Sequence, residues 1–296
     1  MMLVKRLEGR LLKYVHTIGY SFTIFGLIFL TPSWAEVNLG DNTQITWRGS
    51  WQQGGLLVGR VDPEIDVRYR DFSLPRTSNG DFLLGLSRDA DAHLELVLGA
   101  AGRMKRTLSF DVASRSYDIQ RIEGIAQDRV TPPKAVLARI DSEAREVVAA
   151  RAQLSPSEVF MGGFEAPMRG PLTGVYGSQR VYNGVPKSPH YGVDYAAPTG
   201  AKVLAPAAGV VTLTHSDMFY SGGTLIIDHG HGLSSSFLHL SAILVAPGDN
   251  IERGQLIAEV GASGRATGPH LDWRMNWRDV RIDPLLVLQA LPILNQ

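Results

Sequence analysis

Histidine is concentrated in one part of the chain. Six of the eight histidines lie between residues 190 and 270, namely His190, His215, His229, His231, His239 and His270. Histidine is scarce and titrates near neutral pH, so this clustering indicates a metal site or acid–base chemistry. The chain has no cysteine, which excludes a disulfide framework and a thiolate metal site. Any metal ion must therefore be bound by histidine and carboxylate side chains.

Three short motifs in this region have spacings that suit a single site. In the first, His190 and Asp194 lie four residues apart on either side of a glycine. In the second, His239 ends an apolar segment that is typical of a strand. In the third, a Gly- and Pro-rich loop leads into His270 and Asp272, which are two residues apart and so share one face of a strand. These five side chains are predicted to converge on a metal ion or an acid–base site.

The other histidines are interpreted differently. His229 and His231 lie in a Gly-rich turn after a strand and are interpreted as turn residues, with a ligand role as the alternative. His215 is expected in a solvated loop, and His93 in another, despite two neighbouring aspartates. Tyr191, Tyr220 and Trp273 are candidates to line a substrate groove, although aromatic residues in a β-domain more often belong to the core.

The three motifs together resemble the lysostaphin-type zinc metallopeptidases, which cut peptidoglycan cross-links and have a duplicated hybrid motif domain. The resemblance runs from about residue 174 to 284 and includes the segments Ala205–Val211 and Pro247–Asp249. It implies that His190 and Asp194 bind a zinc ion (Zn2+). It also implies that His239 and His270 are the catalytic residues, orienting or deprotonating a zinc-bound water and protonating the leaving amine.

Asp272 departs from the family pattern, which has a zinc-binding histidine at this position. Aspartate is a competent zinc ligand, so one interpretation is a site with one histidine and two carboxylates. A second carboxylate makes the ion less positive, and such an ion polarises a carbonyl less. The alternative is that Asp272 pairs with Arg274 or Arg278, which leaves a weakly metallated site with two ligands.

The elements that must position these residues are mostly strands. Ile65, Val67 and Tyr69 alternate with charged residues, the pattern of a half-buried strand. Asn79-Gly80 lies between apolar segments and predicts a tight hairpin turn. The segment 142–154 is the one clear helix, and it is interpreted as a linker. Gly and Pro are frequent, at 31 and 16 residues, and strand-like segments resume after residue 176.

The predicted fold is mainly β, with a small N-terminal β-sandwich-like domain, a linker helix and a C-terminal antiparallel β-sheet metallopeptidase domain. The predicted boundaries are a signal peptide at 1–35, an all-β accessory domain at 36–118 and a linker with the helix at 119–158. The metallopeptidase domain is expected at 159–284, and a C-terminal tail at 285–296. The resemblance to the accessory domain of exported family members supports the N-terminal assignment.

The N-terminus has the features of an export signal. Four basic residues precede an apolar segment of 13 residues, Ile18–Leu30, which is shorter than the ~20 residues that span a membrane. Ser33-Trp34-Ala35 then places small residues at a cleavage site, so cleavage is expected before Glu36. An uncleaved anchor helix is the alternative. We expect export to the periplasm or cell envelope, with no permanent membrane span after cleavage.

The expected function is that of an exported zinc metalloendopeptidase acting on stem or cross-bridge peptides of peptidoglycan. The alternative is a weakly active or inactive member that binds peptidoglycan or regulates another hydrolase. The formal net charge of zero, from 29 basic and 29 acidic residues, argues against a nucleic-acid partner. A lipoyl- or biotin-type carrier is disfavoured because the strand–turn segment that resembles one has no Met-Lys pair.

Overall fold

The computed structural model describes residues 35–38, 44–99, 105–123 and 134–293. Strands dominate these residues, and the sheets are antiparallel apart from one short pairing, so the prediction of a mainly β fold is confirmed. The predicted signal peptide lies outside the described residues except for Ala35. No helix within the described ranges is long and apolar enough to cross a membrane.

The N-terminal region forms two four-stranded sheets. Their orders are β1 (Ala35–Asn38), β2 (Gln44–Gly49), β3 (Leu56–Arg60), β6 (Asp81–Gly85), and β5 (Phe72–Ser73), β4 (Asp66–Tyr69), β7 (His93–Gly99), β8 (Arg106–Asp111). Aromatic contacts join the sheets, because Trp47 on β2 meets Phe82 on β6 and Phe110 on β8, each at 5.3 Å between ring centroids. Buried and exposed residues alternate along β7, as period-2 patterning predicts.

The turn at Asn79-Gly80 is present but does not make a hairpin. Gly80 has φ 83°, and its N–H donates to the carbonyl of Thr77 at 2.9 Å. The preceding strand β5 pairs with β4, whereas the following strand β6 pairs with β3. The prediction of a hairpin is therefore wrong, because the apolar segments on either side of the turn belong to different sheets.

The linker helix is longer at its start than predicted. Helix α1 covers Lys134–Arg151 rather than 142–154, because the segment 134–141 is itself rich in good helix formers such as Ala, Leu and Arg. Buried Glu143 accepts hydrogen bonds from Arg139 Nε at 2.6 Å and from the backbone N–H of Phe219 at 2.8 Å. The bond from Phe219 attaches α1 to the end of strand β15 (Gly209–Met218), on which the helix packs.

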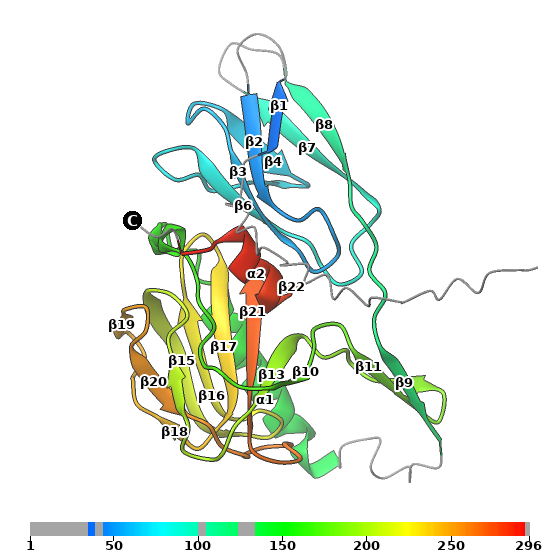
Figure 1. Ribbon diagram of the computed structural model, residues 1–296, viewed down its shortest axis with the longest axis vertical. Helices are drawn as coiled ribbons and strands as arrows, with labels where there is room; N and C mark the ends of the chain where they lie inside the picture. The colour runs from blue at the N-terminus through cyan, green and yellow to red at the C-terminus, as the bar shows by residue number, and fades with distance from the viewer. Residues whose placement is uncertain (1–34, 39–43, 100–104, 124–133, 294–296) are drawn as a thin grey trace, which may run out of the picture. The chain divides into compact units, whose positions relative to one another are not determined.

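The C-terminal region is built on one large antiparallel sheet, whose strands lie side by side in Figure 1. Its order is β10 (Leu172–Gly174), β13 (Gly192–Ala196), β21 (His270–Trp277), β17 (Leu233–Leu240), β16 (Gly222–Asp228), β15, β19 (Asn250–Ile251), with β22 (Val280–Ile282) paired to β21. A smaller sheet consists of β14 (Lys202–Leu204), β20 (Leu256–Glu259) and β18 (Ala242–Ile243). Trp273, Trp277 and Phe237, on strands of the large sheet, are fully buried in the core of this region.

A three-stranded sheet, a 3-10 helix and a C-terminal helix complete the described elements. Strand β9 (Ile119–Ile122), from the predicted linker, pairs in parallel with β11 (Gln179–Tyr182), which also pairs with β12 (Val185–Pro186). A 3-10 helix covers Val159–Gly162. The expected C-terminal tail instead begins with helix α2 (Pro284–Ala290), because Asp283 caps it and its apolar side chains are buried.

Candidate metal and catalytic centre

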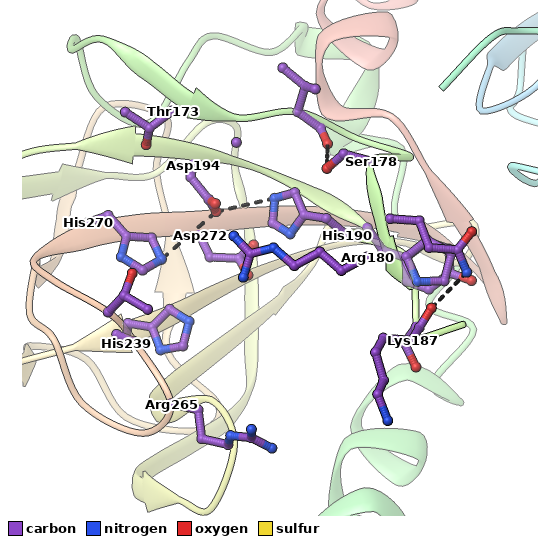
Figure 2. A pocket seen from close by; sticks show the side chains of 18 of the residues that line it. Thr173, Ser178, Arg180, Lys187, His190, Asp194, His239, Arg265, His270 and Asp272 are labelled. Carbon is purple, nitrogen blue, oxygen red and sulfur yellow. Dashed lines mark hydrogen bonds and ion pairs between the residues drawn. The ribbon is translucent and has the colours of Figure 1, made fainter. Parts of the chain in front are cut away.

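A groove of about 1030 Å3 lies over strands β13 and β21 of the large sheet. All five residues predicted from the motifs line it, and Figure 2 shows His190, Asp194, His239, His270 and Asp272 gathered around one point. Among the aromatic candidates, Tyr191 lines the groove. Trp273 does not, because it points into the opposite, apolar face and is fully buried.

Strand register brings the two carboxylates together. Asp194 on β13 lies directly opposite Asp272 on β21, and directly opposite residues project from the same face of a sheet. Two glycines leave the space that the carboxylates occupy. A Cβ added at Gly192 would lie 2.5 Å from Asp272 Oδ1, and one added at Gly174 would lie 2.1 Å from Asp194 Oδ2. The glycine between His190 and Asp194 is therefore required by close approach rather than by a left-handed backbone.

Three side chains offer atoms that can bind a metal ion together. One nitrogen or oxygen each from His190, Asp194 and Asp272 lie within 4.8 Å of one another. His190 Nε2 and Asp194 Oδ1 are 3.2 Å apart, and both atoms are buried without a hydrogen-bond partner. Two buried polar atoms facing one another in this way are costly unless a cation or a proton lies between them.

The two other histidines have one ring nitrogen fixed by a backbone carbonyl. His239 Nδ1 donates to the carbonyl of Ser263, and His270 Nδ1 to that of Gly268, each at 2.8 Å. These bonds fix the tautomer and leave each Nε2 as the acceptor in the neutral ring. The rings are 4.8 Å apart between centroids, and His270 Nε2 lies 4.0 Å from Asp194 Oδ1.

His239 is held as a neutral base. Burial lowers the pKa of its imidazole below 6.5, and the Ser263 carbonyl and the Asp272 carboxylate only partly oppose that effect. Its backbone adopts φ 65°, a conformation that non-glycine residues rarely take. The N–H of His239 donates to the carbonyl of Ser221 at 2.8 Å, which holds this turn at the end of β17.

Asp272 both faces the side chains of His190 and Asp194 and pairs with Arg274. Arg274 Nε lies 3.0 Å from each Asp272 oxygen, and Arg274 Nη2 lies 2.5 Å from Oδ2. Burial would raise the pKa of the Asp272 carboxyl, but the charge and hydrogen bonds of Arg274 outweigh it and hold the pKa below its usual value. Arg278, the other partner considered, instead lies over the ring of Phe72 at 4.2 Å.

His215, His229 and His231 lie outside the groove. His229 is fully buried, with Nδ1 donating to the carbonyl of Ala208 at 2.7 Å and Nε2 2.8 Å from Ser235 Oγ. His231 has φ 49° in the turn and packs against Phe160. His215 lies on strand β15 rather than in a loop, because the strand extends through residue 218.

Sequence reasoning named Arg274 as a possible partner of Asp272 but missed the other arginines around the site. Arg281 and the exposed Arg180 line the groove, and Arg151 of α1 reaches Ser236 on the same sheet. Arg274 could be found because it lies two residues after Asp272 on one strand. No local signal marks Arg281 or Arg151, since their proximity depends on the pairing of β22 with β21 and on the packing of α1.

Comparisons with known proteins agree with the geometry of this region. The model of peptidase family M23 matches residues 188–284. The peptidoglycan DD-endopeptidase ShyA of Vibrio cholerae is 42% identical over 88 residues, which is 30% of this chain and 20% of that protein. The DD-carboxypeptidase/endopeptidase Mpg of Neisseria meningitidis is 39% identical over 107 residues, which is 36% of this chain and 24% of that protein. The chain thus spans a fifth to a quarter of these relatives.

The comparison with solved structures extends beyond the C-terminal region. The crystal structure of a Pseudomonas aeruginosa protein assigned to peptidase M23 matches with a TM-score of 0.64 and 30% identity. The match covers 81% of this chain and 96% of that one. The similarity therefore includes more of the chain than the residues that the family model matches.

Proposed function

This chain belongs to peptidase family M23, and we propose that it is an exported zinc-dependent metalloendopeptidase that hydrolyses peptide bonds in peptidoglycan. The names of the relatives support this substrate, since ShyA and Mpg are both endopeptidases and ShyA is named for peptidoglycan. All five predicted residues line the groove and lie within residues 188–284, which the model of family M23 matches.

The observation that carries the proposal is the pair of buried atoms without hydrogen-bond partners, His190 Nε2 and Asp194 Oδ1, 3.2 Å apart. A metal ion would accept electron pairs from both, and Asp272 can add a third donor from the facing strand. Imidazole nitrogen and carboxylate oxygen are ligands that suit zinc, so the donor set fits this ion. We propose His190, Asp194 and Asp272 as the metal ligands.

The two fixed histidines supply the acid–base chemistry. When bound, zinc supplies Lewis acidity, which polarises a peptide carbonyl and makes water more acidic. His239, neutral and with a free Nε2, is suited to accept the proton of the attacking water. His270, whose Nε2 faces Asp194, is suited to hold the developing oxyanion or to protonate the leaving amine when charged.

A second function is favoured by the Asp272–Arg274 pair. Arg274 already neutralises the Asp272 carboxylate, so this site has less need of a metal ion than one with an unpaired ligand. A protein that binds peptidoglycan or regulates another hydrolase without cutting it would have such a site. The two functions differ in zinc content.

The test is metal analysis combined with digestion of purified peptidoglycan. We expect about one zinc per chain, retained after washing with a weak chelator, and new peptide ends in the digest. His239→Ala should keep most of its zinc but lose hydrolysis by about 100-fold or more, since it acts on water and substrate. A zinc-free wild-type protein that leaves peptidoglycan intact would support the regulator instead.

Asp272 is tested by two substitutions. As a ligand, Asp272→Ala should lose zinc, whereas Asp272→His should keep it with a more electrophilic ion. Unchanged zinc content and unchanged hydrolysis in Asp272→Ala would show that Asp272 pairs with Arg274 and does not bind the metal ion.

Export and domain organisation are part of the same proposal. We propose a signal peptide at 1–35, an accessory domain at 36–118, a linker at 119–158 and a catalytic domain at 159–284. N-terminal sequencing of protein from the cell envelope should find Glu36 first. An intact initiator methionine would contradict cleavage.

A further inference from the structure

Three arginines lie beside the proposed metal site on the same face of the large sheet. Arg274 on β21 is directly opposite Ser236 on β17, and Arg281 on β22 is directly opposite Asn276 on β21. Arg274 and Asn276 are two residues apart, so all these side chains project from the face that carries Asp272. Arg151, the last residue of α1, joins them, because its Nη2 donates to Ser236 Oγ at 2.8 Å.

The positive charge of this cluster is poorly compensated. Asp272 forms an ion pair with Arg274. Within the described ranges, neither Arg151 nor Arg281 has a carboxylate within ion-pair distance. Arg281 instead lies over the ring of Tyr191, 5.3 Å from its centroid. Arg151 Nε and the nearby Ser234 Oγ and Asn276 Oδ1 are buried without a hydrogen-bond partner.

The electrostatic effects agree with this geometry. Burial first, and then the charges of Arg281 and Arg274, together lower the pKa of the Arg151 guanidinium to about 9. Burial, then the charge of Arg274, also lowers the pKa of Arg281. The guanidinium groups are therefore close enough to repel one another, and an anion placed among them would relieve that repulsion.

The cluster is open to the groove on one side. Arg274 and Arg281 line the groove together with the predicted catalytic histidines, whereas Arg151 lies behind them. The groove lining contains five Lys or Arg side chains and three Asp, so it attracts a negatively charged ligand even before a metal ion adds its charge. A planar guanidinium matches a carboxylate in shape and can bind it with two hydrogen bonds.

We propose that Arg281, supported by Arg274 and Arg151, forms a carboxylate-binding subsite beside the reaction centre, so that the preferred substrate is a peptide with a free carboxylate close to the cleaved bond. This inference rests on the proposed function and specifies its substrate. Arg281 is the residue that contacts the carboxylate. Arg151 acts from behind, by adding positive charge.

The test compares two forms of one ligand. A purified cross-linked muropeptide dimer with free carboxylates, and the same dimer with those groups converted to carboxamides, are titrated into the purified, metal-free protein by calorimetry. We expect the free acid to bind about tenfold tighter or more, the range of a charge-assisted hydrogen bond. Arg281→Gln should abolish this preference, and Arg281→Lys should keep part of it.

The matched control is Arg169→Gln, since Arg169 is exposed in the same region and does not line the groove. It should keep the full preference, and circular dichroism should show that the variants are folded. Equal binding of both dimers by the wild type would overturn the proposal, as would a folded Arg281→Gln variant that keeps the preference. Inorganic phosphate that competes as well as the free acid would also overturn it, because the cluster would then be a general anion site.

Failure of this inference can be told apart from failure of the proposed function. Equal binding and equal cleavage of the two dimers by the zinc-loaded protein would reject the subsite and keep the endopeptidase. A preference for the free acid without cleavage of either dimer would keep the subsite and reject the endopeptidase.

Discussion

A buried carboxylate in the N-terminal β-sandwich and a carboxylate in the C-terminal sheet differ in their hydrogen-bond donors. Asp81 on β6 is 1% exposed and accepts hydrogen bonds from Arg60 Nε at 2.7 Å, Arg60 Nη2 at 3.1 Å and Thr77 Oγ1 at 3.2 Å. Asp194 on β13 is more exposed, at 21%, yet its Oδ1 is buried without a hydrogen-bond donor. Burial of a carboxylate alone therefore does not mark a candidate functional site, and the missing donor is what distinguishes Asp194 from Asp81.

The same contrast separates two buried histidines within the C-terminal sheet. Both nitrogens of His229 have a hydrogen-bonding neighbour, and the ring contributes to the core. Only Nδ1 of His239 is engaged, and its other nitrogen is available at the groove. A side chain whose hydrogen bonds are all used within the fold is structural, whereas one with an unused atom at a groove can act on a ligand.

The largest effect is expected from Asp194→Asn. The amide is a far weaker ligand than the carboxylate, so zinc should be lost and hydrolysis should fall by about 1000-fold or more. The metal-free variant should unfold at no lower denaturant concentration than the metal-free wild type, because among the described residues Asp194 Oδ1 accepts no hydrogen bond and its ion-pair neighbours are only the imidazoles of His190 and His270. Metal analysis and urea unfolding measure both, and a large loss of stability would contradict a functional role for Asp194.

A pH effect is expected from His229, whose pKa burial lowers to about 4. The unfolded imidazole binds a proton near pH 6.5, whereas the folded one does not until about pH 4. The neutral histidine therefore contributes stability above pH 6.5 that is lost as the pH falls to 4. Over this range the wild type should lose about 3 kcal/mol more free energy of unfolding than His229→Gln.

The comparison with the variant is needed because Asp228 acts in the opposite direction. Burial raises the pKa of its carboxyl to about 6, so the folded protein takes up that proton first and gains stability as the pH falls from 6. This contribution is present in both proteins and cancels in the difference. His215→Gln, at a half-exposed position, serves as the control and should follow the wild type.

Asp81→Asn tests the structural side of the comparison. Breaking a buried ion pair is destabilising, and the partial exposure of Arg60 reduces the effect, so the free energy of unfolding should fall by about 2 kcal/mol. Zinc content and the rate of hydrolysis should not change. Urea unfolding and metal analysis check both, and loss of zinc here would remove the distinction between the two carboxylates.

The smallest effect is expected from Arg274→Gln. Arg274 engages both oxygens of Asp272, so a metal ion must displace it from at least one of them. Removing the guanidinium also removes its repulsion of the ion, and we expect zinc to bind about tenfold tighter. Competition with a chelating dye measures the affinity. Weaker binding in the variant would mean that Arg274 chiefly orients Asp272 for the metal.

Local patterns were sufficient for much of the fold and for naming five side chains that the structure brings to one groove. Alternation around β4 predicted a strand, because a strand repeats every two residues. His270 and Asp272 were placed on one face by the same period. The hairpin at Asn79-Gly80 was wrong because sheet membership is not a local property. The start of the helix at 142 was wrong although the signal was local, because the helix formers of the segment 134–141 were not counted.

The sequence by itself determined which residues are available for chemistry: a cluster of histidines, no cysteine, and aspartates at spacings that suit one site. The tertiary structure alone decided that Asp194 lies opposite Asp272, that two glycines leave room for them, and that Arg281 and Arg151 gather beside Arg274. These contacts join strands far apart along the chain, and their register is set by burial across the whole sheet rather than by neighbouring residues.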